Sequence, residues 1–176
     1  MKPLTGIVRA AFLGFFASHI PITLIVDGQA VFPPSLVPQF AKDVLRWYST
    51  TFNDRLMTPP YDNIFFTSFI WCELLFQLPF FVIATNVLCG KKVDGTGWFR
   101  SLCLIYGAHT CTTLIPILVS IANQSENTTK EKIILVAFYL PYLIFPFWLT
   151  LICLFNKDIL LDQQKCETQY IHAKVH

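Results

Sequence analysis

Two carboxyl side chains lie in or at the end of apolar stretches of the sequence, where an ionised group is energetically unfavourable. Glu73 lies inside an apolar run between Asp62 and Lys91, and Asp27 ends the first apolar run of the chain. An ionised carboxyl near the middle of a membrane helix costs about 2.5–3.5 kcal/mol, so Glu73 must be neutral or paired. If the two carboxyls meet in a cavity of low dielectric constant, desolvation and repulsion favour a shared proton. An ammonium group could replace that proton, so the pair predicts a cation site.

A purely structural role is also open for Glu73, as a protonated carboxyl that donates a hydrogen bond between helices. Gln77 follows one helical turn later, so the two side chains can hydrogen-bond each other or line one polar strip. His19 precedes Asp27 by two turns on a similar helix face. A lone histidine there is more often a satisfied core residue than a catalytic base.

Further candidate residues lie in the later apolar runs. The stretch 109–113 (His-Thr-Cys-Thr-Thr) forms a polar stripe, although Thr112 and Thr113 can bond back to carbonyls of their own helix. Tyr139 and Tyr142 flank a proline, and their ring faces either suit an ammonium group or pack between helices. Histidines and cysteines are too scattered for a metal site, and no catalytic motif is present. We predict no metal, cofactor or catalytic residue.

The elements that must position these residues are membrane helices. Apolar residues make up 54% of the 176, and the mean hydropathy of +0.53 exceeds what a soluble domain of this length can bury. The net charge of +2 offers nucleic acid no basic surface. Four segments are long enough to cross about 30 Å of hydrocarbon, near 8–27, 64–88, 99–121 and 133–155. We predict an all-α, four-helix membrane domain over 8–155 and a tail over 156–176.

Proline occurs in every predicted span. A proline inside a helix cannot donate to the carbonyl four residues back, so it bends the helix axis. One such residue is ordinary in a membrane helix, but bends in all four helices can splay a small bundle around a cavity. The residues are Pro21, Pro79, Pro116, Pro141 and Pro146.

The segment between the first two spans predicts a lid. Residues 39–52 have the period of an amphipathic helix, which lies either on the membrane surface or with its aromatic face packed on the bundle. In both cases it covers one end of the bundle. The predicted apolar stripe consists of Phe40, Val44, Trp47, Tyr48 and Phe52.

An even number of spans places both termini on one side of the membrane. Eight of the 13 Lys and Arg residues lie in the tails and second loop, which favours a cytosolic side for them. The third loop is then lumenal, but its sequons at Asn123 and Asn127 lie too close to the bilayer for efficient glycosylation. No cysteine falls in a predicted lumenal segment, so we expect no structural disulfide.

Four strings resemble the sigma-2 receptor group of the EXPERA family, in order over about residues 10–155. They are 18–24 (SHIPITL) followed by Asp27, 72–81 (CELLFQLPFF), 109–118 (HTCTTLIPIL) and 139–143 (YLPYL). The resemblance implies the EXPERA fold of four membrane helices with a lumenal helical loop, usually as a homodimer. It further implies a multi-pass protein of the rough endoplasmic reticulum, nuclear and endolysosomal membranes. One departure is the end of the chain, His172-Ala-Lys-Val-His176, which lacks the group's dilysine-like signal.

The same resemblance implies a ligand class and a set of partners. Members of this group bind sterols, including cholesterol and oxysterol, and cationic amphiphilic amines in a cavity within the membrane. They regulate cholesterol homeostasis and trafficking together with the Niemann-Pick C1 transporter, the low-density lipoprotein receptor and the progesterone receptor membrane component.

Matching strings also imply roles for individual residues. Asp27 would pair with the ligand amine and Glu73 would hydrogen-bond Asp27, while Asp54 would support the lid without touching ligand. The remaining cavity residues would be His19, Gln77, Thr113, Tyr139 and Tyr142.

Two functions from different classes use such a site. One is a receptor without enzymatic activity, and the other is a sterol delta8–delta7 isomerase, in which an acid protonates an alkene carbon and a base removes a proton elsewhere. The isomerase branch of the family has a histidine one turn before the acidic residue of its first helix. This chain has Thr23, which cannot serve as that proton donor. We therefore expect the receptor.

Overall fold

Long apolar runs form four helical rods in the computed structural model, which describes residues 6–90 and 96–155. Each rod has 25 to 27 residues, and at 1.5 Å per residue this length exceeds the hydrocarbon thickness of a bilayer. No strand occurs in the described residues, so the predicted all-α membrane fold is confirmed. The predicted tail over 156–176, with Cys166 and the chain end, lies outside the described residues.

The rods are built from the following elements. The first contains α1 (Gly6–Ile25) and the short η1 (Asp27–Ala30), and the second contains α3 (Ile64–Cys72), η3 (Glu73–Gln77) and α4 (Leu78–Leu88). The third is α5 (Thr96–Asn123), and the fourth is α6 (Thr129–Tyr139) followed by α7 (Pro141–Phe155). Between the first two rods lie η2 (Pro34–Leu36) and α2 (Gln39–Phe52).

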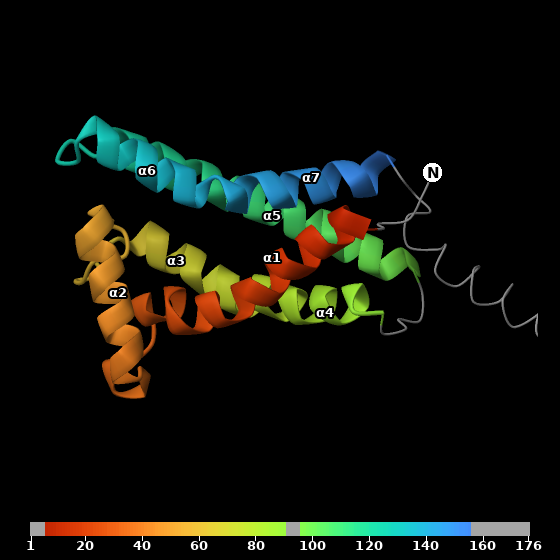
Figure 1. Ribbon diagram of the computed structural model, residues 1–176, viewed down its shortest axis with the longest axis horizontal. Coiled ribbons are helices and arrows are strands. Elements are labelled where there is room, and N and C mark those ends of the chain that lie inside the picture. Colours follow the sequence, from red (N-terminus) through yellow and green to blue (C-terminus); the bar gives the residue numbers. More distant parts are fainter. Residues whose placement is uncertain (1–5, 91–95, 156–176) are drawn as a thin grey trace, which may run out of the picture.

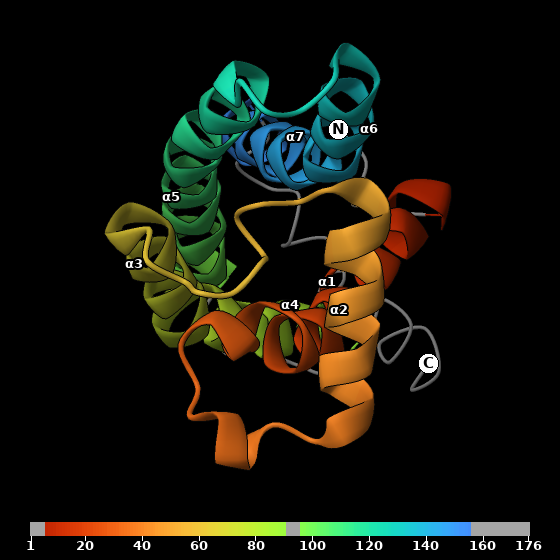
Figure 2. The ribbon, with the colours of Figure 1, turned by 90° about the vertical axis from the view of Figure 1, so that its left-hand side faces the viewer.

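The rods pack in two pairs. α1 packs along α4, and α5 packs along α7, as Figure 1 shows. The helix α2 stands across one end of the bundle, roughly perpendicular to the rods (Figure 1). Seen from that end, α2 lies in front of the bundle, and the segment that follows it crosses toward α3 (Figure 2). The structure thus has the lid that the amphipathic segment predicts.

Two of the prolines mark interruptions in their rods. A widened turn, in which the Leu78 amide donates to the Glu73 carbonyl five residues back, directly precedes Pro79. Pro141 begins α7 after the break at Leu140. Proline lacks the amide that would continue the hydrogen-bond ladder, so the chain widens or restarts there. Pro21, Pro116 and Pro146 lie inside helices that continue past them.

The fourth rod begins earlier than the sequence predicts. α6 starts at Thr129 instead of 133, because Thr128 accepts a hydrogen bond from the Glu131 amide and the Glu131 side chain accepts one from the Thr128 amide. This reciprocal capping satisfies amides that the first helical turn leaves without partners. The charged residues Lys130 and Lys132 therefore belong to the helix start.

The predicted aromatic stripe of α2 divides between two surfaces. The face toward the bundle is made by Ala41, Leu45 and Ser49, which are buried, together with the partly buried Tyr48. Phe40 and Trp47 are 59% and 61% exposed. The bundle end covers only part of the helix circumference, so Tyr48 packs against the bundle, whereas Phe40 stays largely exposed.

Candidate functional site

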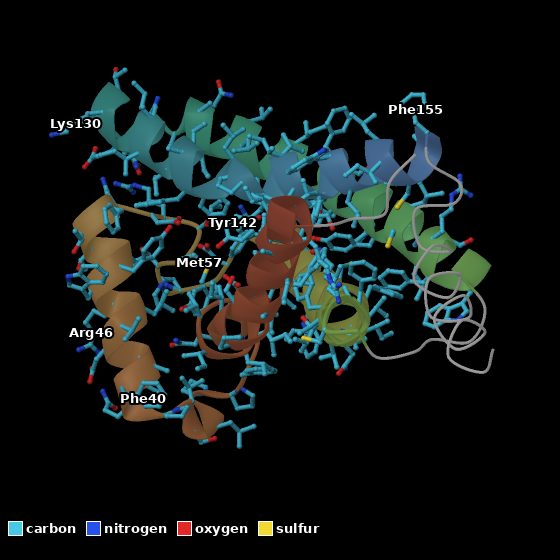
Figure 3. All side chains as sticks on the ribbon, turned by 45° about the vertical axis from the view of Figure 1, so that its right-hand side comes forward. Phe40, Arg46, Met57, Lys130, Tyr142 and Phe155 are labelled. Atoms are coloured by element: carbon cyan, nitrogen blue, oxygen red, sulfur yellow. The ribbon has the colours of Figure 1, made fainter. Side chains whose placement is uncertain are left out.

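A cavity of about 330 Å³ lies inside the bundle beneath α2. Its walls come from all four rods and from α2, and most of the lining side chains are apolar or aromatic. In Figure 3, Met57 and Tyr142 both lie toward the middle of the bundle, whereas Phe40 and Arg46 lie on the outer part of α2. All seven predicted ligand-binding residues line this cavity: His19, Asp27, Glu73, Gln77, Thr113, Tyr139 and Tyr142.

The two carboxyls enter the cavity from different rods. Asp27 begins η1, immediately after α1, and Glu73 begins the widened turn η3. Both carboxyls line the same cavity. No lysine or arginine is among the described residues that line the cavity. The site therefore presents two carboxyls in apolar surroundings without a protein cation to balance them.

Thr23 takes the position next to Glu73. Its hydroxyl donates a hydrogen bond of 2.6 Å to Glu73 Oε1, and the Thr23 side chain is fully buried. In the structure, Thr23 supplies the hydrogen bond to Glu73, and the bond between Asp27 and Glu73 that the family resemblance implies stays a prediction. Thr23 lies one turn before Asp27 on the same helix face. That spacing is the signal by which the sequence could have added it to the site.

A glycine lets the chain turn tightly between these residues. A Cβ at Gly28 would lie 3.1 Å from the Thr23 carbonyl oxygen and 2.5 Å from the Phe32 ring. Any larger residue would push η1 away from the end of α1. Gly28 thus allows η1, which begins with Asp27, to pack closely against the end of α1.

Gln77 is bonded to α5 instead of to Glu73. Its side-chain Oε1 accepts a 3.2 Å hydrogen bond from Thr110, and both side chains are buried. In a regular α-helix, residues four apart lie on nearly the same face. The widened turn over 73–77 has more residues per turn, so the side chains of Glu73 and Gln77 are less closely aligned. Thr112 and Thr113 donate to the carbonyls of Ala108 and Thr110, so their predicted back-bonding is confirmed.

His19 lies in an aromatic environment at the side of the cavity. Its Nδ1 is 2.8 Å from the Phe15 carbonyl, which can only accept, so Nδ1 carries the proton and Nε2 is the free nitrogen. The rings of Phe15, Tyr142 and Phe81 surround it at centroid distances of 4.2, 4.5 and 5.1 Å. The carbonyl bond and the ring contacts fix the orientation of the imidazole.

Asp54 lies behind the cavity wall and not in it. The fully buried carboxylate accepts hydrogen bonds of 2.9 Å from the hydroxyls of Tyr48 and Tyr139 through Oδ2. Its Oδ1 accepts hydrogen bonds from the backbone amides of Leu56, at 3.0 Å, and Met57, at 3.3 Å. Burial, together with the adjacent Asp54 carboxylate, raises the pKa of the Tyr48 hydroxyl, which therefore stays protonated and able to donate. Asp54 connects the lid helix α2 to α6.

The arrangement is suited to binding an amphiphile. No cluster of three or more histidine, cysteine or acidic side chains that could hold a metal ion occurs within residues 6–90 and 96–155. The five cysteines in those ranges are free thiols. Two carboxyls, a glutamine amide, a histidine nitrogen and aromatic faces converge on an apolar cavity. Such a site can hold a cationic or hydroxyl-bearing amphiphile.

Comparison with known proteins agrees with this architecture. Residues 40–153 match the model of the EBP family, described as EXPERA, the expanded EBP superfamily. The sigma intracellular receptor 2 of Xenopus tropicalis is 41% identical over 162 residues, covering 88% of this chain and 92% of that protein. The human sigma intracellular receptor 2 is 42% identical over 151 residues, covering 80% and 83%.

A more distant relative comes from fission yeast. The efficient mitochondria targeting-associated protein 19 of Schizosaccharomyces pombe is 30% identical over 139 residues, covering 78% of this chain and 69% of that protein. The family match covers more than half of the chain, and the receptor matches extend over most of both sequences. The chain therefore belongs to the EXPERA family, with the sigma intracellular receptors 2 among its relatives.

Proposed function

We propose that the protein is a membrane receptor that binds cationic amphiphilic amines and sterols in the cavity beneath α2, without catalysing a reaction. The observation that carries the proposal is the pair Asp27 and Glu73, which lines an apolar cavity that no described lysine or arginine lines. An ammonium group entering this cavity would replace the missing cation. Because the surroundings are apolar, the attraction is stronger there than in water.

The geometry supports a division of roles within the ligand. Asp27 would pair with the ammonium group, while Glu73, bonded to Thr23, would add to the negative potential. The faces of Tyr139 and Tyr142 would contact the methylene groups next to the nitrogen. An apolar body, such as a sterol ring system, would occupy the wall formed by residues of α3 and α5: Phe66, Phe69, Ile70, Leu114 and Ile117.

The decisive experiment removes the charge of Asp27 while preserving its shape. Asp27→Asn should abolish binding of a tritiated cationic amphiphile, N,N-dimethyldodecylamine, to purified protein without reducing expression. Asp62→Asn is the matched control, because Asp62 is exposed and does not line the cavity. Unchanged affinity in Asp27→Asn would rule out the charge-pairing mechanism.

A sterol isomerase is the competing function within the same family. The proposed receptor has Thr23 beside Glu73, and a threonine hydroxyl is too weak an acid to protonate an alkene carbon. Membranes containing the protein should therefore convert no delta8 sterol to its delta7 isomer. Turnover that disappears in Glu73→Gln would overturn the receptor proposal.

The cellular setting extends the proposal. The receptor would lie in the endoplasmic reticulum, nuclear and endolysosomal membranes with both termini in the cytosol, and would act as a homodimer. Its role would be cholesterol homeostasis, with the Niemann-Pick C1 transporter, the low-density lipoprotein receptor and the progesterone receptor membrane component as partners. Lipid mass spectrometry of gently purified protein tests the ligand class, because a sterol in stoichiometric amount is the expected result.

A further inference from the structure

A second polar network lies outside the cavity, where the segment after α2 meets the loop between α5 and α6. Its centre is Asn127, which is 6% exposed. The Asn127 side-chain amide donates to the Asn53 carbonyl at 2.9 Å, and its Oδ1 accepts from Arg55 Nε at 3.2 Å. One side chain thus holds the residues on both sides of Asp54.

The remaining contacts of this network are weaker or more exposed. Asn53 Nδ2 reaches Glu131 Oε1 at 3.4 Å, and Arg55 forms an ion pair with Glu126. The side chains of Arg55 and Glu126 are 45% and 61% exposed, and an ion pair in that setting contributes little. The two hydrogen bonds of Asn127, which are partly buried, therefore carry most of the connection.

The position of Asp54 determines three parts of the cavity wall. Tyr48, Met57 and Tyr139 all line the cavity, and each is bonded to the Asp54 carboxylate, Met57 through its backbone amide. Asn53 supports this geometry by adopting a left-handed conformation, with φ of 53°, that ends α2 and turns the chain toward the bundle. A displacement of residues 53–55 would therefore disturb the contacts of Asp54 with α2, with the segment after α2 and with α6 at the same time.

We propose that Asn127 is a positioning residue for the ligand cavity: by bonding the Asn53 carbonyl and the Arg55 side chain, on either side of Asp54, it fixes the wall formed by Tyr48, Met57 and Tyr139 and thereby slows ligand release. Asn127 itself does not line the cavity. The ligand arm of the test rests on the proposed function, and the hydrogen-exchange arm below does not.

In the ligand arm, the full-length protein in lipid nanodiscs is loaded with tritiated N,N-dimethyldodecylamine and diluted. Asn127→Ala should release the amine about tenfold faster than the unchanged protein, with little change in the association rate. Asn127→Asp should behave similarly, because a carboxylate cannot donate to the Asn53 carbonyl. Release at the unchanged rate from both variants would overturn the proposal.

Two controls separate the amide from its neighbours. Glu126→Gln removes the exposed ion pair on the same loop, and Thr129→Ala removes the sequon while keeping the Asn127 amide, since Thr129 is exposed. Both should release the amine at the unchanged rate. Fast release in Thr129→Ala would assign the effect to a glycan instead of the amide and would contradict the proposal.

In the hydrogen-exchange arm, no ligand is present. The Leu56 and Met57 amides donate to Asp54, so their exchange should accelerate in Asn127→Ala while exchange in α4 and α5 stays unchanged. Unchanged exchange at these two amides, or acceleration spread evenly over all helices, would overturn the positioning role. If the unchanged protein binds no amine, the proposed function fails, and this arm still decides whether Asn127 holds Asp54.

Discussion

At the scale of single residues, Thr23 supplies the hydrogen bond that stabilises the Glu73 carboxyl within a membrane helix. A buried carboxylate must be paired or hydrogen-bonded, and the described residues supply one hydroxyl for this purpose. The bond also holds the first rod against the second at the level of the cavity. Thr23 thus contributes both to the charge of the site and to its shape.

Replacing Thr23 by valine keeps the volume and removes the hydroxyl. Without its donor, the ionised form of Glu73 becomes less favourable, so the cavity attracts an ammonium group less strongly. Thr23→Val should lower the affinity for N,N-dimethyldodecylamine by about tenfold or more, since hydrogen bonds to charged groups are worth about 1.5–3 kcal/mol. Equilibrium binding measures the change. Thr23→Ser retains the donor and should stay near the unchanged affinity, and equal loss in both variants would count against the hydrogen bond.

At the scale of elements, α5 and α7 approach each other closely at a glycine. A Cβ at Gly107 would collide with the Thr150 hydroxyl and lie 2.9 Å from the Pro146 carbonyl oxygen. Small residues let membrane helices pack backbone to backbone, which is a main source of their association. The close contact holds the third and fourth rods, which carry Thr110, Thr113 and the tyrosines of the site.

Gly107→Ala should therefore destabilise the protein by about 1–3 kcal/mol, the usual cost of overpacking. A thiol-reactive dye in a thermal ramp follows unfolding, because Cys103 and Cys153 are buried in the folded bundle. Gly14→Ala is the matched control: nothing lies within 4 Å of a Cβ there, so alanine should leave stability unchanged or raise it. An equal melting temperature for Gly107→Ala and the unchanged protein would contradict the close packing.

At the scale of the whole molecule, much of the architecture could be predicted because hydropathy and periodicity report it directly. The apolar runs give four rods, and the period of residues 39–52 gives α2. The cost of charge in lipid singled out Glu73, and the structure places it in the cavity with Asp27.

Contacts between distant segments leave no such periodic signal. The bonds of Asn127 to Asn53 and Arg55 join residues more than 70 positions apart. The division of the α2 stripe depends on how much of that helix the bundle end can cover. The widened turn at Glu73 depends on which residue before Pro79 shifts its backbone hydrogen bond to the carbonyl five residues back. The first two of these features are fixed by tertiary packing, and the third by how the backbone adjusts before a proline.

Membrane orientation is a property of the complete molecule, and it can be tested with existing surface positions. Cys89 is exposed at the end of α4, whereas Phe40 is exposed on α2 at the opposite end of the bundle. The excess of lysine and arginine in the tails and second loop predicts that Cys89 lies on the cytosolic side. In sealed endoplasmic reticulum vesicles, a membrane-impermeant maleimide should label a variant whose only cysteine is Cys89. A variant whose only cysteine comes from Phe40→Cys should react only after permeabilisation, and the reverse pattern would invert the topology and place the lid in the cytosol.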